Sequence, residues 1–290
     1  MMNKKYDLIG FGEIFLRLTP SKNEKGLTVK KQVLGSELDV VSGVSALGLR
    51  TGFISCLPGH GISDYILDYL RSCGIDDNLV ILSKYEDAKL GLYFSEEEGF
   101  PDKNDIVYDR KKAALNQIVL TDIPADIYNN TRLFHTGGVT LSLSDNVFRI
   151  GLELMKRFKE NGVPVSFDVN YEANLWNEAE LKTALVKILP CVDVLFISER
   201  ILRRTLPKKA TLKELIRDYS LNFQINTIVV IEQPKLKIKR SRLKQDPDIL
   251  IYDAQKDTFQ SELPDEGGQL NAETSAREDY ISCILYGLLK

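Results

Sequence analysis

The feature that most constrains the fold of this chain is a regular alternation of short apolar strands with amphipathic helices. Residues 6–74 contain two such strand-and-helix pairs, and residues 132–232 contain four strands separated by three helices. Strands that are connected through helices in this way lie parallel in one sheet, and the helices cover both of its faces. We therefore predict an α/β fold with a central, mostly parallel sheet.

Four segments interrupt this rhythm, and within each of them apolar residues alternate with polar ones. They are residues 15–20, 27–33, 90–95 and 105–110. A period of two is typical of strands that expose one face to solvent. We predict that these segments form a small four-stranded sheet outside the main body, built from residues 13–34 and 88–112.

The composition excludes several classes of protein. Apolar residues make up 43% of the 290 residues and charged residues 27%, as in soluble globular proteins, and the net charge of −3 gives no field that would attract nucleic acid or a membrane. No apolar run is long enough to span a membrane, and the first five residues lead into no signal peptide. The four cysteines lack paired spacing, which predicts reduced thiols in a cytoplasmic protein, and two histidines are too few for a metal site.

Residues 267–290 carry the most information about function. Two glycines and a run of small polar residues lead into a helical pattern, and Ser275 and Glu278 have the spacing of a capping box. The predicted buried face of this helix consists of Tyr280, Cys283, Ile284 and Gly287. The start of a helix presents unpaired backbone N–H groups and a positive dipole end, which favour a bound anion. A capped core helix without any ligand would explain the same residues.

Several segments resemble the PfkB (ribokinase-like) sugar kinases, and in particular their 2-keto-3-deoxygluconate kinase branch. The family sequence Asp-Thr-Thr-Gly-Ala-Gly-Asp-Ala-Phe, followed by a helix that ends in Leu-Tyr-Gly-Leu, is similar to residues 272–280 and 285–288. The segments that are similar to the lid strands, the next strand and the sugar end of the cleft in that branch are Gly91–Phe94, Val107–Arg110, Phe134–Gly138 and Ser166–Tyr171. The resemblance implies a ribokinase-like fold for residues 1–290, with the small sheet as a lid.

The resemblance also implies which residues bind the ligands, with a sugar or sugar acid as substrate and ATP and Mg²⁺ as cofactors. The implied substrate-binding residues are Gly35, Asp39, Tyr93, Tyr108, Arg110, Asp168, Asn170 and Glu172. The implied anion- and nucleotide-binding residues are Glu199, Ser275, Ala276 and Arg277. Glu278 stands where the family has the catalytic aspartate, which accepts the proton of the attacking hydroxyl. Aligning Asp279 there instead would rotate the helix by roughly 100° and misplace its predicted buried face.

At several of these positions the chain departs from the family. Ser275 and Arg277 replace two glycines, and a longer glutamate replaces the catalytic aspartate. Asp39 stands where the family has asparagine, Glu172 stands where it has arginine, and residues 232–237 lack the glycines of the nucleotide turn. Phosphoryl transfer depends on positioning, and a displacement of ~1 Å can cost ~10²-fold in rate.

We therefore expect a catalytically impaired homologue that retains at most sugar or sugar-acid binding. Two alternatives stay open. The first is an active ATP-dependent sugar-acid kinase that uses Glu278 as its base, and the second is a structural protein that forms a homodimer through the lid. No nucleic-acid or membrane partner is expected from the acidic balance and the absence of long apolar runs.

Overall fold

The computed structural model describes residues 4–20, 29–94, 107–109, 112–206, 209–231, 249–261 and 276–290. The strands of the main sheet in these ranges are β1 (Tyr6–Phe11), β4 (Thr51–Leu57), β5 (Ile75–Asp76), β6 (Val80–Leu82), β9 (Thr131–Gly137), β10 (Val165–Asp168), β11 (Val194–Ile197), β12 (Thr227–Ile231), β13 (Ile249–Asp253) and β14 (Thr258–Gln260). Their order is β14-β13-β12-β11-β10-β9-β1-β4-β5, with β6 beside β4. Neighbours from β12 to β5 pair in parallel, whereas β13 and β14 are antiparallel.

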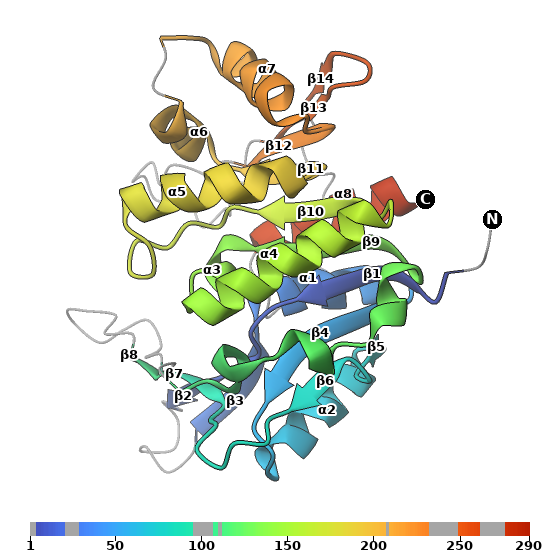
Figure 1. Cartoon of the computed structure of the whole chain (residues 1–290), viewed down its shortest axis with the longest axis vertical. Helices are drawn as coiled ribbons and strands as arrows, with labels where there is room; N and C mark the ends of the chain where they lie inside the picture. The colour runs from blue at the N-terminus through green and yellow to red at the C-terminus, as the bar shows by residue number, and fades with distance from the viewer. Residues whose placement is uncertain are drawn as a thin grey trace, which may run out of the picture.

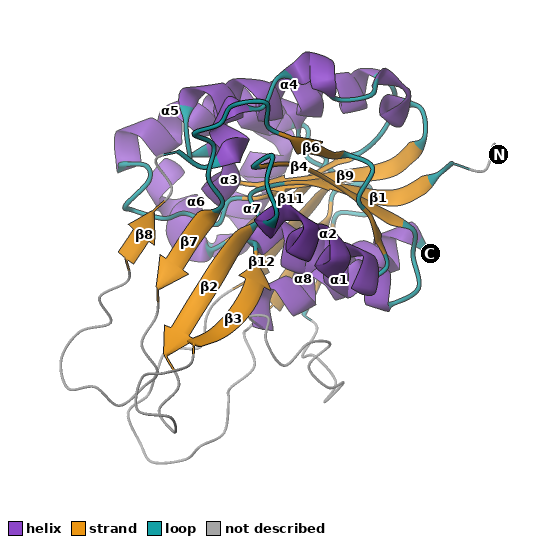
Figure 2. Cartoon of the chain, turned by 90° about the horizontal axis from the view of Figure 1, so that it is seen from below, coloured by secondary structure: helices purple, strands orange, loops and turns teal. Residues whose placement is uncertain are grey.

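Helices cover both faces of this sheet, as Figures 1 and 2 show. One face packs against α1 (Ser36–Ala46), α2 (Ile62–Ser72) and α8 (Ala276–Leu289), and the other against α3 (Gly138–Leu141), α4 (Asp145–Glu160), α5 (Glu178–Ile188), α6 (Glu199–Thr205) and α7 (Leu212–Phe223). Short 3₁₀ turns are η2 (Ala114–Gln117), η3 (Leu120–Asp122), η4 (Ala125–Tyr128) and η5 (Leu189–Cys191).

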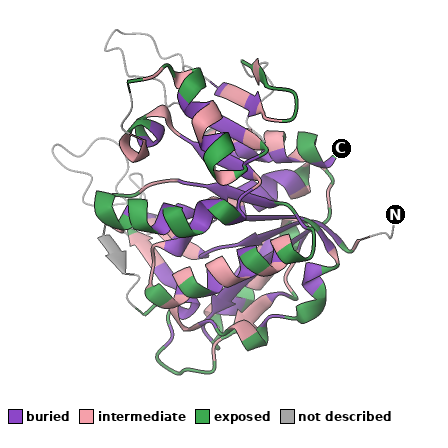
Figure 3. Cartoon of the chain, turned by 45° about the horizontal axis from the view of Figure 1, so that its top comes forward, coloured by how far each residue is buried: buried purple, intermediate pink, exposed green. Residues whose placement is uncertain are grey.

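Strand β1 shows why the sheet needs both helical layers. Its residue Leu8 belongs to the apolar core under α1, α2 and α8, whereas Ile9 and Phe11 belong to the core under α4 to α7. Successive side chains of a strand point to opposite faces, so a strand with apolar residues on both faces must be covered on both sides. Figure 3 shows these buried strands between helices that are exposed along their outer sides. The predicted α/β fold with a mostly parallel central sheet is confirmed.

A second, small sheet lies apart from the main one (Figure 2). Its order is β3 (Val29–Leu34), β2 (Phe15–Pro20), β7 (Gly91–Phe94) and β8 (Val107–Asp109). Strands β2 and β7 are parallel, and the two outer pairs are antiparallel. The prediction of a separate small sheet in addition to the central one is confirmed.

Helix α8 packs against α1, but not through the predicted face. Its buried residues are Glu278, Ile281, Ser282, Leu285 and Leu289. The prediction of Tyr280, Cys283, Ile284 and Gly287 as the buried face was wrong, because Cys283 and Gly287 are exposed and the other two are half-buried. Apolar residues occupy most positions of this helix, so their spacing does not identify one face. The contact with α1 selects it, and the Ser282 hydroxyl donates a hydrogen bond of 3.0 Å to the Val40 carbonyl.

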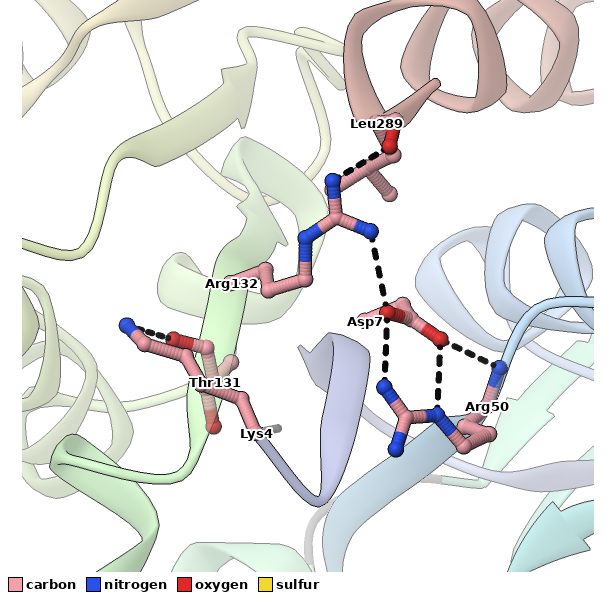
Figure 4. A network of polar contacts seen from close by, with 6 residues as sticks. All are labelled: Lys4, Asp7, Arg50, Thr131, Arg132 and Leu289. Atoms are coloured by element: carbon pink, nitrogen blue, oxygen red, sulfur yellow. Dashed lines mark hydrogen bonds and ion pairs between the residues drawn. The ribbon is translucent and has the colours of Figure 1, made fainter. Parts of the chain in front are cut away.

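An ion-pair network lies at the amino ends of the central strands (Figure 4). Asp7 in β1 accepts hydrogen bonds from Arg50 Nε at 3.0 Å, Arg50 Nη2 at 3.1 Å and Arg132 Nη1 at 3.0 Å. Arg132, in β9, also donates to the Leu289 carbonyl in the last turn of α8. We call Asp7, Arg50 and Arg132 the amino-end network. It ties the carboxyl end of α8 to the sheet.

Within the described ranges, no helix combines the length and the apolar character that crossing a membrane requires. All four cysteines are free thiols in this structure. Cys56 and Cys191 are buried, whereas Cys283 lies exposed on α8.

Candidate functional site

The strand order creates one natural place for a ligand. After β1 the chain continues to β4 on one side of β1 and later returns to β9 on its other side. In open α/β sheets, such a reversal leaves a crevice at the carboxyl ends of the strands, and ligands bind there. In this chain the carboxyl ends of β1, β9 and β10 meet the first turns of α1 and α8 at that point.

Glu37, in the first turn of α1, is buried in this crevice. The Thr140 hydroxyl donates a hydrogen bond of 2.7 Å to Glu37 Oε2 and accepts one of 3.3 Å from the Glu13 N–H. Gly12 and Gly137 leave room for the carboxylate, because a Cβ atom at either position would lie 2.6 Å from one of its oxygens. Burial raises the pKa of Glu37 to about 7, and neighbouring carboxylates add to this rise against the Thr140 hydrogen bond.

Two further acids, Glu278 of α8 and Asp39 of α1, approach the same place where these helices pack together. Glu278 is only 8% exposed, whereas Asp39 is half-buried. Burial raises the pKa of Glu278 to about 7; the charge of Asp168 raises it further, and that of Arg277 lowers it. Loss of hydration and the charge of Glu278 raise the pKa of Asp39 well above its usual range. We call Glu37, Asp39, Asp168 and Glu278 the carboxylate cluster.

Asp168, the last residue of β10, is bound by the Arg277 guanidinium through two hydrogen bonds. Arg277 Nε donates to Oδ2 at 3.1 Å and Nη2 to Oδ1 at 2.5 Å, and the two side chains are 16% and 7% exposed. The Asn170 N–H also donates to Asp168 Oδ1, at 3.3 Å. Asn170 has a φ of 27°, and its amide donates to the Ser36 hydroxyl at 3.4 Å. The ion pair between Arg277 and Asp168 joins the start of α8 to the carboxyl end of β10.

A cavity of about 290 Å³ lies on the other side of Arg277, toward the ends of β11 and β12. The residues that line it are Val169, Asn170, Tyr171, Ser198, Arg200, Ile201, Ile231 and Arg277. Two arginines thus border this cavity, whereas acids dominate the neighbouring crevice. Arginine is the side chain best suited to phosphate and carboxylate groups, because its planar donors bind two oxygens at once.

This arrangement has two chemical capacities. A buried carboxyl group with a pKa near 7, such as that of Glu278, can accept a proton at neutral pH. The two arginines can receive an anion in the cavity. Among the described residues, however, no group of three histidine, cysteine or acidic side chains could hold a metal ion.

The structure brings together five of the residues predicted for ligand binding, namely Gly35, Asp39, Asp168, Arg277 and Glu278, with Asn170 beside them. Gly35 caps α1, and a Cβ atom there would lie 2.3 Å from the Glu13 carbonyl oxygen. Ala276 begins α8, directly before Arg277.

Other predicted residues lie elsewhere. Tyr93 is in the small sheet, opposite Tyr108 on β8, with its ring edge-on to Phe15 at 6.3 Å between centroids. Glu172 is exposed, and Glu199 forms an ion pair of 2.6 Å with Arg203 one turn along α6. Arg110, Ser275 and the turn at 232–237 lie outside the described residues.

The sequence reasoning did not identify Glu37 or Thr140 as site residues. Glu37 looks like an ordinary first-turn acid of α1, and Thr140 lies more than a hundred positions away in the chain. A usable signal was present in Gly12 and Gly137, since glycines at the ends of two buried strands often mark a close approach of another group. Their partner emerges only when the strands are placed side by side.

Comparison with known proteins agrees with this geometry. The sequence pattern of the pfkB family carbohydrate kinases matches residues 2–235. A 2-dehydro-3-deoxygalactonokinase of Haloferax volcanii is 29% identical over 227 residues, which span 77% of this chain and 70% of that protein. A 2-dehydro-3-deoxygluconokinase of Bacillus subtilis is 29% identical over 178 residues, or 59% of this chain and 53% of that protein. This chain thus matches only about half the length of the second relative.

The fold comparison reaches further along the chain. A crystal structure of fructokinase from Xylella fastidiosa with bound ATP superposes with a TM-score of 0.77 and 18% identity, over 98% of this chain and 82% of that one. Because the sequence identity is low, this structural likeness supports only the fold. The sequence match over most of the chain is independent of this likeness, and on that basis the chain belongs to the pfkB family of carbohydrate kinases.

Proposed function

We propose that this pfkB-family member binds a 2-keto-3-deoxy sugar acid in the crevice at the carboxyl ends of β1, β9 and β10, and that it transfers phosphoryl groups from ATP slowly or not at all. The two relatives described above are named as kinases of 2-dehydro-3-deoxy sugar acids, which supports the substrate class. The single observation that carries the proposal is the Arg277 guanidinium, held by Asp168 where the resemblance calls for glycine.

Arg277 bears on phosphoryl transfer because of its place at the start of α8. Backbone N–H groups at a helix start can hold the transferring phosphoryl group only if it approaches them closely, which glycine permits and a long side chain obstructs. Arg277 also occupies Asp168, a carboxylate suited to sugar hydroxyls. ATP, when bound, supplies the phosphoryl group, and in this chain Arg200 and Arg277 are the described residues that could hold its phosphates.

An active kinase is the second candidate, and the state of Glu278 favours it. A buried carboxyl with a pKa of about 7 is well matched to accepting a hydroxyl proton near neutral pH. In this alternative Arg277 would neutralise phosphate charge in the transition state instead of blocking the approach. The two candidates share the sugar-acid site and differ in the role of Arg277.

Calorimetric titration separates these functions. 2-Keto-3-deoxygluconate and ATP–Mg²⁺ are titrated separately into the full chain, and ADP release is then measured with both present. Binding of the sugar acid with little or no ADP release is the expected result. Turnover at an ordinary kinase rate, ~1–100 s⁻¹, would support the active kinase. No binding of either ligand would contradict both candidates and leave a structural role, such as a homodimer formed through the small sheet.

A further inference from the structure

The pair between Arg277 and Asp168 links two parts of the site that face different ligands. Asp168 belongs to the carboxylate cluster in the crevice, next to Asn170. Arg277 borders the neighbouring cavity together with Arg200. Each side chain of the pair therefore has a second role, and a ligand that takes the same donors or acceptors competes with the pair.

The pair is not required to dock α8. Ile281, Leu285 and Leu289 are 0%, 0% and 6% exposed against the sheet and α1, and Ser282 bonds to the Val40 carbonyl. The far end of the helix is held by Arg132 at the Leu289 carbonyl. Buried ion pairs also contribute little net stability, because desolvation offsets much of their attraction. Opening this pair therefore need not release the helix.

Charge nevertheless keeps the pair closed in the absence of a ligand. Separation from Arg277 would take away the cation that binds Asp168 beside Glu37 and Glu278, two other acids at the same crevice. An anion near Arg200 and Arg277 changes this balance, since it gives the guanidinium another partner of the same charge as Asp168. The released Asp168 carboxylate can then accept hydrogen bonds from sugar hydroxyls.

We propose that Arg277 and Asp168 form a latch that couples the two halves of the site, so that an oxyanion bound by Arg277 in the cavity releases Asp168 to bind the sugar. This inference rests on the proposed sugar-acid function. The oxyanion is a phosphate group, either free or part of a nucleotide. Coupling between two sites is reciprocal, so the sugar must strengthen anion binding by the same factor. We expect a factor of about 10, within the ~5–150-fold range typical of such coupling.

The test is the affinity for 2-keto-3-deoxygluconate, measured by calorimetry with and without inorganic phosphate, and in a separate arm with ATP. Sodium chloride at the same ionic strength is the control. Phosphate or ATP is expected to tighten sugar binding in the wild type by about 10-fold. An effect of phosphate identifies the free anion as sufficient, and an effect of ATP alone identifies the nucleotide.

Two variants assign the effect to the latch. Arg277→Gln should bind the sugar as tightly without an anion as the wild type does with one, and should show no further effect of phosphate. Arg157→Gln, which breaks the surface pair with Glu153 on α4, is the matched control and should behave as the wild type. If Arg277→Gln does not fold, Arg277→Lys keeps a cation but cannot bind Asp168 through two parallel bonds, and should weaken the coupling.

A readout without sugar keeps this inference separate from the proposed function. Asp168→Asn removes the internal competitor, so inorganic phosphate should bind this variant about 10-fold more tightly than the wild type. If no variant binds the sugar but Asp168→Asn gains phosphate affinity, the latch stands and the sugar-acid function fails. Equal sugar affinity with and without either anion, together with unchanged phosphate affinity of Asp168→Asn, would overturn the latch.

Discussion

The amino and carboxyl ends of the central strands, between which α8 runs, carry opposite balances of charge. At the amino ends of the strands, one carboxylate, Asp7, is bound by Arg50 and Arg132. At the carboxyl ends, Glu37, Asp168 and Glu278 lie around one bound guanidinium, that of Arg277.

The pKa values follow this difference. Burial alone would raise the pKa of Asp7, but hydrogen bonds from Arg50 and Arg132 outweigh it and lower the pKa to about 2. At the other end, burial raises the pKa of Glu37 and Glu278 to about 7. A charge matched by its partners stabilises the fold, whereas a surplus of buried acids is costly and is typical of a functional site. We infer that the charges at the amino ends of the strands stabilise the fold and that those at the carboxyl ends serve function.

The largest expected effect on stability comes from removing the charge of Asp7, which its two arginine partners balance. Asp7→Asn should lower the free energy of unfolding by about 2–4 kcal/mol, somewhat below the usual cost of breaking a fully buried pair because both arginines are half-exposed. Glu278→Gln, at the surplus end, should cost nothing or stabilise the fold at pH 8. Urea unfolding measures both. Asp87→Asn, which removes an exposed pair with Lys112, is the control and should cause no measurable change. A loss of stability in Glu278→Gln as large as in Asp7→Asn would contradict the comparison.

The pH dependence of stability should differ in sign between the two ends. For Glu278 the folded chain still holds a proton between pH 4.5 and about 7 that the unfolded chain has lost, so stability falls as the pH rises through this window. A rise of the pKa from 4.5 to about 7 corresponds to about 3 kcal/mol. For Asp7 the sign is reversed, and its contribution is lost as the pH falls from 3.8 through about 2.

The measurement compares urea unfolding of the wild type and Glu278→Gln between pH 5 and pH 8. The variant should gain stability relative to the wild type as the pH rises. The difference in stability between the two proteins isolates Glu278 from His135, which both proteins contain. Burial lowers the pKa of His135 to about 4, so below pH 6.5 this histidine makes stability rise with pH, opposite to the effect of Glu278. Parallel pH curves for the two proteins would show that the Glu278 carboxyl is not held protonated.

Sugar-acid binding should respond to the carboxyl end and the small sheet but not to the amino end. Arg110→Ala should weaken binding of 2-keto-3-deoxygluconate by about 1.5–3 kcal/mol, the usual range for hydrogen bonds to charged groups. Glu172→Arg should strengthen it, because a cation replaces an exposed acid in the loop after β10. Asp7→Asn, assayed under conditions where it is folded, should leave the affinity unchanged. Unchanged affinity in both Arg110→Ala and Glu172→Arg, measured by calorimetry, would remove the assigned pocket.

The smallest effect is expected from correcting the length of one carboxylate. Glu278→Asp alone should change ADP release by less than about 10-fold, because Arg277 still fills the start of α8. The triple variant Ser275→Gly, Arg277→Gly and Glu278→Asp should restore ATP binding before it restores turnover. ATP titration followed by an ADP-release assay distinguishes the two steps. Full turnover in Glu278→Asp alone would show that the glycines matter less than the aspartate.

Local patterns were sufficient to predict most of the fold. The buried strand at Thr51–Leu57 and the helix that ends before Gly162 follow from apolar runs and periodicity. The face of α8 was misassigned by about one residue position, because its apolar residues nearly surround the helix and only the contact with α1 distinguishes Ile281 and Leu285.

The site was less predictable because it depends on contacts between distant segments. Arg277 and Asp168 are 109 positions apart, and their pairing follows from the order of strands and from how α8 docks. Glu37 gave no signal of its own, since its burial arises from two separate chain segments, which contain Gly12 and residues 137–140 and meet at the same crevice. The resemblance to the sugar kinases identified Glu278 and Asp168 individually, but it could not indicate a contact that requires an arginine where the family has glycine.

The most direct test of the account is the steady-state rate of ADP release by the wild-type chain with saturating ATP–Mg²⁺ and 2-keto-3-deoxygluconate. Obstruction by Arg277 should hold the rate at least about 100-fold below that of ordinary kinases, which turn over at ~1–100 s⁻¹. The same preparation should bind the sugar acid in calorimetry, which shows that the site is intact. A wild-type rate within the ordinary range would contradict the account, because it would mean that the arginine held by Asp168 does not obstruct phosphoryl transfer.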